Sequence, residues 1–120
     1  MLIAVLSLAA VLSQAPYPPS ETVLGVSFQF ETHMRLAPGS DNWPVTWADD
    51  GNQYTAWGDG GGFGGSNEEG RVSNGFARIS GDANVYAGAN VAGGRDAPAL
   101  PPFTGKCYGL ISVNGSLYAW

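Results

Sequence analysis

Glycine is the residue that most restricts how this chain can fold. It fills 18 of the 120 positions, and proline fills another 8. Glycine at this density is about twice its ordinary usage of roughly 7%, and both residues destabilise the interior of a helix. We therefore predict an all-β or loop-rich fold with little helix.

The N-terminus, "MLIAVLSLAAVLSQAPYPPS", begins with an apolar run over residues 2–12. The run is too short to cross a bilayer of about 30 Å, but it has the size of a signal-peptide core. No Lys or Arg precedes it, and the small-residue cleavage motif "SQA" is followed at once by proline. We predict a signal peptide at residues 1–15, a Pro-rich linker at 16–20 and a secreted or periplasmic protein without a stable membrane anchor. The alternative is a buried strand or helix.

Charge and cysteine content narrow the function further. Ten acidic and five basic residues give a formal net charge of −5, and the absence of a basic stripe argues against nucleic-acid binding. The single cysteine, Cys107, and the single histidine, His33, allow no disulfide within the chain and no site that needs several Cys or His ligands. We therefore expect no metal and no cofactor, and we expect Cys107 to be a small buried residue.

Alternating apolar residues predict a first strand in "ETVLGVSFQF", residues 21–30. "PVTWA" and "QYTAWG" then flank an Asp-Gly turn, which is typical of a hairpin. The glycine-rich stretch 58–74 reads as a long loop, and "GFARISG" as a third strand. "NVYAGANVAGG" is weakly patterned, and "RDAPALPPFTGK" is a Pro-rich connection.

The C-terminal stretch "CYGLISVNGSLYAW" repeats the design of the first hairpin. Gly51 is followed three residues later by Tyr54, and Gly115 is followed three residues later by Tyr118. Repeated antiparallel hairpins are typical of successive β-propeller blades, although two repeats cannot close a ring. Because the sequence stops in an apolar strand, we expect it to be the N-terminal part of a longer protein.

Three blocks of sequence carry a family resemblance. "SDNWPVTWADDGNQYTAWGDGGGFGG", "GRVSNGFARISG" and "PPFTGKCYGLISVNGSLYAW" resemble the opening third of the bacterial domain-of-unknown-function family 4185, over residues 21–120. The resemblance implies the N-terminal blades of a secreted five-bladed β-propeller, with the later blades absent. Some members of that family are endo-D-arabinanases, so it also implies hydrolysis of a furanose polysaccharide such as D-arabinan.

Four aspartates crowd around the first hairpin, and hairpin geometry divides them into two pairs. Asp41 precedes the first strand and Asp59 follows the second, so antiparallel pairing brings both to one end, while Asp49 and Asp50 lie at the opposite turn. Glycoside hydrolysis needs one carboxyl group to protonate the leaving oxygen and one to act as base or nucleophile. We predict that Asp41 and Asp59 are catalytic and fill one or both of these roles. The alternatives are loop capping for Asp41 and turn formation for Asp59.

Aromatic and amide side chains near these acids are the predicted substrate contacts. Trp43 can stack on a sugar ring, and Asn42 can hydrogen-bond a sugar hydroxyl or form a turn. Trp47 and Trp57 lie within strands, and we expect them to pack between blades.

Four other charged residues are weaker candidates. Glu68 and Glu69 are expected to be a solvated pair or second-rank acids, and Arg71 and Arg78 can orient a carboxylate or lie at the surface. Three function classes stay open: a secreted hydrolase, a sugar-binding propeller without chemistry, and a structural or protein-binding module. The partner of the first two is a polysaccharide, and the oligomeric state is open.

Overall fold

The computed structural model describes residues 17–120, so the predicted signal peptide at 1–15 lies outside the described residues. The chain divides into two units, Met1–Phe30 and Glu31–Trp120, and a 3-10 helix, η1 (Phe30–Thr32), spans the boundary in sequence.

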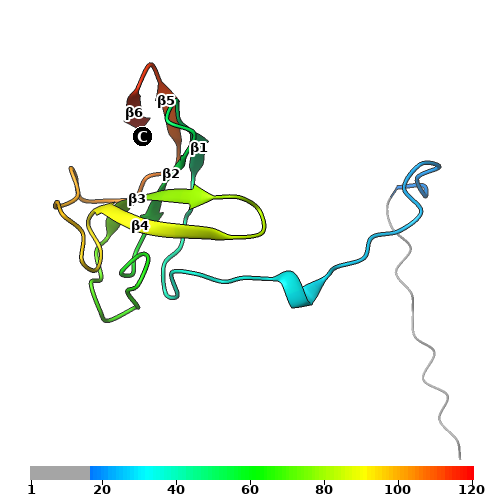
Figure 1. Ribbon diagram of the computed structural model, residues 1–120, viewed down its shortest axis with the longest axis horizontal. Helices are drawn as coiled ribbons and strands as arrows, with labels where there is room; N and C mark the ends of the chain where they lie inside the picture. Colours follow the sequence, from blue (N-terminus) through cyan, green and yellow to red (C-terminus); the bar gives the residue numbers. More distant parts are fainter. Residues whose placement is uncertain (1–16) are drawn as a thin grey trace, which may run out of the picture. The chain divides into compact units, whose positions relative to one another are not determined.

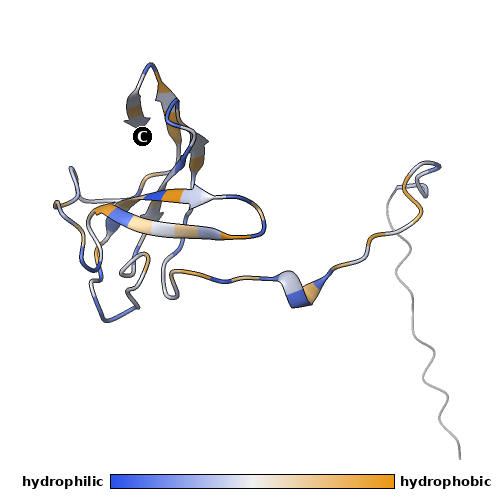
Figure 2. Cartoon of the chain, viewed as in Figure 1, coloured by the Kyte–Doolittle hydropathy of each residue, from blue (hydrophilic) through white to orange (hydrophobic). Residues whose placement is uncertain are grey.

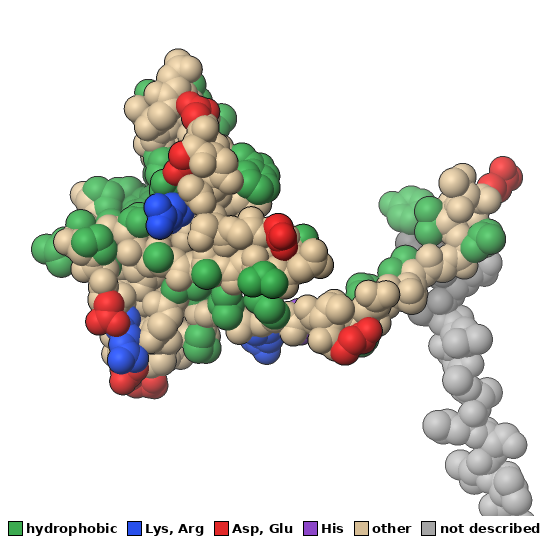
Figure 3. Space-filling model, in the orientation of Figure 1, with side chains coloured by type: hydrophobic (Ala, Val, Ile, Leu, Met, Phe, Trp, Pro, Cys, Tyr) green, Lys and Arg blue, Asp and Glu red, His purple; other side chains and the backbone are tan. Residues whose placement is uncertain are grey.

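The predicted strand at 21–30 is wrong. No strand is assigned to this segment, and none of the strand ladders includes it. Its apolar side chains are exposed, among them Leu24 at 93%, and the rings of Phe28 and Phe30 stack with centroids 5.7 Å apart. Hydrophobic residues recur along this part of the cartoon (Figure 2), and hydrophobic side chains lie on its surface in the space-filling view (Figure 3). Alternation describes a side-chain pattern, but a strand also needs a backbone partner, which sequence alone cannot supply.

The second unit is built around a four-stranded antiparallel sheet (Figure 1). Its strands pair in chain order: β1 (Val45–Trp47), β2 (Gln53–Gly58), β3 (Asn74–Gly81) and β4 (Tyr86–Ala92). The first two form the predicted hairpin, in which Gly51 takes a φ of 77° at the turn. The all-β prediction is confirmed, because the only helix among residues 17–120 is η1.

β4 is a strand that the sequence pattern does not reveal. It carries three alanines and a glycine, and Val91 is its one β-branched residue. Small residues are needed there because the Phe63 ring lies where a side chain of Gly88 would be. The β3–β4 ladder also shifts register between Phe76 and Ala77, so a bulge interrupts the alternation.

One face of the sheet forms the hydrophobic core with the C-terminal segment. Ala56 of β2 and Phe76 of β3 cluster with Cys107 and Leu110, and Tyr54 packs against them. The Cys107 side chain is fully buried, and its thiol donates to the Gly109 carbonyl at 3.1 Å. The prediction that this cysteine is a small buried residue is confirmed.

The other face of the sheet holds the Trp57 indole, which has no exposed surface. Gly62, Gly75 and Gly94 surround this ring, and a side chain on any of them would overlap it. Trp43 stacks on Trp57 with ring centroids 5.7 Å apart and an interplanar angle of 28°. Three of the 18 glycines therefore make room for one large ring.

Asn90 of β4 fastens the long loop between β2 and β3 to the sheet. Its Oδ1 accepts from the backbone N–H of Phe63 at 2.9 Å, and its Nδ2 donates to the Phe63 carbonyl at 3.0 Å. The same Nδ2 lies 3.1 Å from the Gly61 carbonyl and 2.8 Å from the Arg95 carbonyl. The loop contains no strand or helix, as predicted, yet its backbone is bonded to the sheet.

The second hairpin is a separate two-stranded sheet, β5 (Leu110–Val113) and β6 (Ser116–Ala119), as the repeat predicts. Two side chains of the first hairpin hold it. Thr46 Oγ1 accepts from the Ser112 N–H at 3.1 Å, and Asp49 Oδ2 accepts from the Gly115 N–H at 2.9 Å. The two hairpins are thus joined by side-chain to backbone bonds and not by a shared ladder.

Candidate functional site

Asp41 and Asp59 lie at the same end of the β1–β2 hairpin, as antiparallel geometry predicts. Asp41 forms an isolated bridge with Gly58, the residue before Asp59. Its N–H donates to the Gly58 carbonyl at 2.9 Å, and the Gly58 N–H donates back to the Asp41 carbonyl at 2.7 Å. Backbone pairing therefore fixes the two aspartates next to each other.

Two cations lie against the Asp59 carboxylate. Lys106 Nζ is 2.7 Å from Asp59 Oδ1, and an Arg71 guanidinium nitrogen is 3.4 Å from the same oxygen. The Lys106 Nζ atom is buried, so this short contact is made away from solvent. The Lys106 ammonium, with help from Arg71, lowers the pKa of Asp59 below its ordinary range. Asp59 is therefore held ionised.

Gly58 is the residue around which these side chains gather. A methyl group placed on it would lie 2.8 Å from Lys106 Cδ, 3.0 Å from Asp41 Oδ1 and 3.2 Å from Asn42 Nδ2. Asn42 and Asp59 both have left-handed backbones, with φ of 52° and 50°. Such conformations are uncommon without glycine, and Asn and Asp are among the residues that adopt them most readily.

We call the group of Asp41, Asn42, Asp59, Arg71 and Lys106 the Asp41–Asp59 cluster. Within it the two acids differ. Asp59 is committed to two cations, whereas no ion pair or side-chain hydrogen bond engages the Asp41 carboxylate in the described part of the chain. No backbone N–H there donates to that carboxylate either, so the capping alternative for Asp41 finds no support. The left-handed φ of Asp59 agrees with its turn-forming alternative.

Trp43 packs against other aromatic rings and, in the described unit, does not line an open site. Besides its stack on Trp57, it meets Phe63 edge-on, with centroids 5.7 Å apart at 64°. Its Nε1 donates to the Ser40 carbonyl at 3.3 Å. Half-buried in this way, Trp43 supports the backbone that leads into Asp41 and Asn42. Its role in stacking on sugar stays a prediction.

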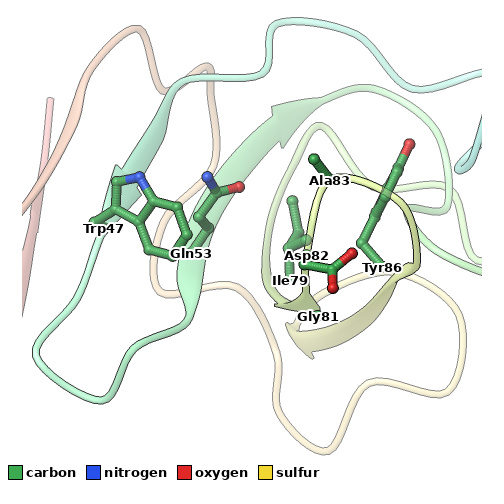
Figure 4. Close-up of a pocket in the computed structure, with 7 residues that line it drawn as sticks. All are labelled: Trp47, Gln53, Ile79, Gly81, Asp82, Ala83 and Tyr86. Atoms are coloured by element: carbon green, nitrogen blue, oxygen red, sulfur yellow. The ribbon is translucent and has the colours of Figure 1, made fainter.

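Trp47 on β1 has an exposed indole. It is 64% exposed, whereas the indole of Trp57 is fully buried. Packing of these two rings between blades stays a prediction. Trp47 lines a pocket of about 270 Å³ together with Gln53 and residues of the β3–β4 turn. Figure 4 shows Trp47 and Gln53 on one side of this pocket and the turn residues on the other. Sequence reasoning missed this pocket, because it depends on β4.

Asp49 and Asp50 lie at the opposite turn, and Asp50 forms it. Asp50 Oδ1 accepts from the Asn52 N–H at 3.0 Å, and its Oδ2 accepts from the Tyr54 hydroxyl at 2.9 Å. The Asn52 hydrogen bonds lower the pKa of Asp50, with a smaller attraction from Arg78. The Asp50 carboxylate in turn raises the pKa of Tyr54. The prediction that Asp50 is a turn residue is confirmed.

The remaining charged candidates lie on the loop between β2 and β3. Glu69 pairs with Arg95 at 2.6 Å, and Glu68 accepts from the Ser66 hydroxyl at 3.2 Å. Both acids are exposed and are not drawn into the Asp41–Asp59 cluster. Of the two predicted orienting arginines, Arg71 does reach a carboxylate, that of Asp59. Lys106 was not predicted, since nothing in "TGKCYGL" distinguishes it from a surface lysine.

Within residues 17–120, no three His, Cys, Asp or Glu side chains come close enough together to hold a metal ion. None of the helices in that part of the chain is long and apolar enough to span a membrane. Comparisons with protein-family models, with curated proteins and with solved structures find no match to this chain.

Proposed function

We propose that this chain carries the acid site of a secreted enzyme that hydrolyses a furanose polysaccharide such as D-arabinan. In this proposal the two sheets are the N-terminal blades of a five-bladed β-propeller. The family resemblance and the repeated hairpins support that reading. The observation that carries the activity is the backbone bridge that holds Asp41 beside Asp59.

The chemistry follows from the different surroundings of the two acids. A proton donor must be protonated before it acts, and Asp59, paired with Lys106 and Arg71, is held ionised. We assign proton donation to Asp41, which no cation engages in the described part of the chain, so the glycosidic oxygen receives its proton as the bond from that oxygen to the anomeric carbon breaks. Asp59 stabilises the oxocarbenium-like centre as a negative charge. As a base it takes the proton of the attacking water; as a nucleophile it bonds to the anomeric carbon, and water deprotonated by Asp41 then displaces it.

Substitution of single carboxylates tests the proposal. Asp41→Asn keeps size but removes the acid, so the release of reducing ends from arabinan should fall about 10²–10⁴-fold, with substrate binding little changed. Asp50→Asn, at the far turn, is the matched control and should leave turnover nearly intact. Asp59→Asn should also cause a large loss, whereas a small one returns Asp59 to a turn role. Retained turnover in Asp41→Asn overturns the catalytic assignment.

A second function, polysaccharide binding without chemistry, is favoured by one observation. The exposed Trp47 indole and its pocket lie apart from both aspartates. Binding of arabinan by the wild-type protein with no reducing ends released would select this function. It would also leave the propeller interpretation in place, because binding modules and enzymes share folds.

A further inference from the structure

The pocket beside Trp47 combines an open aromatic face with polar groups. Trp47 on β1 pairs in register with Gln53 on β2, and Gln53 pairs with Ile79 on β3. Residues paired directly across an antiparallel sheet have side chains on the same face, so these three side chains form the base of the pocket. Tyr86 of β4 and Asp82 of the turn complete the wall (Figure 4).

Asp82 is held in a fixed position with one oxygen available. Its Oδ1 accepts from the backbone N–H groups of Asn84 at 2.8 Å and Val85 at 3.0 Å. These two bonds lower the pKa of Asp82, Val85 contributing most, so the group is ionised at neutral pH. Oδ2 has no hydrogen-bond partner within residues 17–120. The turn thus presents a rigid hydrogen-bond acceptor. Binding a ligand to it costs little conformational entropy, because the side chain is already held in place.

A sugar ring fits this combination better than a purely apolar ligand does. Its C–H face packs on an indole, while its hydroxyl groups donate to a carboxylate or exchange hydrogen bonds with an amide such as that of Gln53. The pocket volume, about 270 Å³, lies just below the range of roughly 300–1,000 Å³ for drug-sized ligands, which suits one ring. We propose that the Trp47 pocket binds one sugar unit of a polysaccharide.

This pocket is distinct from the Asp41–Asp59 cluster. Gln53 and Gly58 are the two ends of β2, about 17 Å apart at 3.3 Å per residue. They also differ in parity along the strand, so a side chain at Gly58 would point to the opposite face from Gln53. One monosaccharide cannot contact both sites. The pocket therefore engages a different unit of the same polymer, an inference that rests on the proposed function for the identity of that polymer.

Native gel electrophoresis with polysaccharide in the gel tests the pocket directly, because a protein of net charge −5 migrates readily and is retarded when it binds. Debranched arabinan should retard the wild-type protein. Trp47→Ala should weaken apparent affinity at least about tenfold, and Gln53→Leu and Asp82→Asn should weaken it less. Asp82→Asn keeps the turn, since Asn also accepts from backbone N–H groups. Tyr108→Ala, which removes another exposed aromatic ring outside the pocket, is the control and should bind like wild type.

Several outcomes overturn the pocket. The first is that Trp47→Ala and the wild type are retarded equally. The second is that Tyr108→Ala weakens binding as much as Trp47→Ala does. The third is that neither arabinan nor xylan retards the wild type. Retardation by xylan alone, with the same dependence on Trp47, supports the pocket and refutes the proposed furanose substrate. Weakened binding in Trp47→Ala together with full turnover in Asp41→Asn supports the pocket and refutes the catalytic role of Asp41. The same weakened binding with no reducing ends released by the wild type supports the pocket and refutes the hydrolase. Far-UV circular dichroism of each variant confirms that the fold is intact.

Discussion

Replacing Asn90 by alanine should destabilise the fold, because this side chain fastens the β2–β3 loop. Of the backbone groups that it contacts, the Gly61 carbonyl keeps a second bond from the Arg95 N–H at 2.9 Å. The Arg95 carbonyl is exposed and can bond to water. The N–H and carbonyl of Phe63 are part-buried and lose their partner. Two orphaned groups at about 1–1.5 kcal/mol each reduce the free energy of unfolding by about 2–3 kcal/mol.

Urea denaturation followed by far-UV circular dichroism measures this loss. With a slope of about 1.5 kcal/mol/M, the midpoint of Asn90→Ala should fall by about 1.3–2 M. Asn90→Asp should lose at least as much, because it sets a carboxylate against carbonyl oxygens. Asn84→Ala, an exposed asparagine in the β3–β4 turn, is the matched control, with an expected shift within about 0.3 M. If Asn90→Ala and Asn84→Ala have the same midpoint, the loop is not held by Asn90.

Three further predictions concern the second unit and export. Gly58→Ala should lower the free energy of unfolding by about 1–3 kcal/mol, since its methyl group meets Lys106 and Asp41. Gly25→Ala, where nothing lies within 4 Å of the new methyl group, is the control and should leave stability unchanged. Equal melting temperatures of the two variants refute the predicted clash at Gly58. Because its pKa is lowered, Asp59 stabilises the fold at pH values above the ordinary aspartate pKa of about 4, and this contribution disappears as the pH falls through the lowered pKa. Urea midpoints measured between pH 2 and 6 should therefore depend less on pH in Lys106→Met than in the wild type. An unchanged pH profile contradicts the ion pair. Expression in a secreting host should release a product that begins after Ala15, and intact mass decides it, retention of Met1 being the contrary result.

The parts of this fold that the sequence predicts are those set by local rules. Asp50-Gly51 and Asn114-Gly115 specify tight turns between β-branched and aromatic runs, and both hairpins form where expected. The same geometry places Asp41 beside Asp59, because antiparallel pairing follows from the turn alone. Local chemistry was therefore enough for the hairpins and for the position of the two acids.

What could not be predicted depends on residues distant in sequence. Lys106 reaches Asp59 across 47 positions, and β4 is a strand only because β3 pairs with it and Phe63 needs Gly88 to be small. For residues 21–30 the error is the opposite one. The alternation of apolar and polar residues is present and predicted a strand, but no strand ladder includes this segment. From the sequence, Trp43 is expected to contact substrate and Trp47 to pack within the fold, whereas in the structure Trp43 stacks on Trp57 and Trp47 is exposed.

The pair of indoles formed by Trp43 and Trp57 gives the folded chain an optical property of its own. Two identical chromophores 5.7 Å apart, with planes inclined at 28°, are neither parallel nor perpendicular, so their electronic transitions couple and split. Such coupling produces a doublet of opposite sign in the far-ultraviolet circular dichroism spectrum, superimposed on the weak signal of a β-rich backbone. The doublet should vanish in Trp43→Phe and persist in Trp47→Phe. It reports on side-chain packing in a region of the spectrum that ordinarily reports only on backbone conformation.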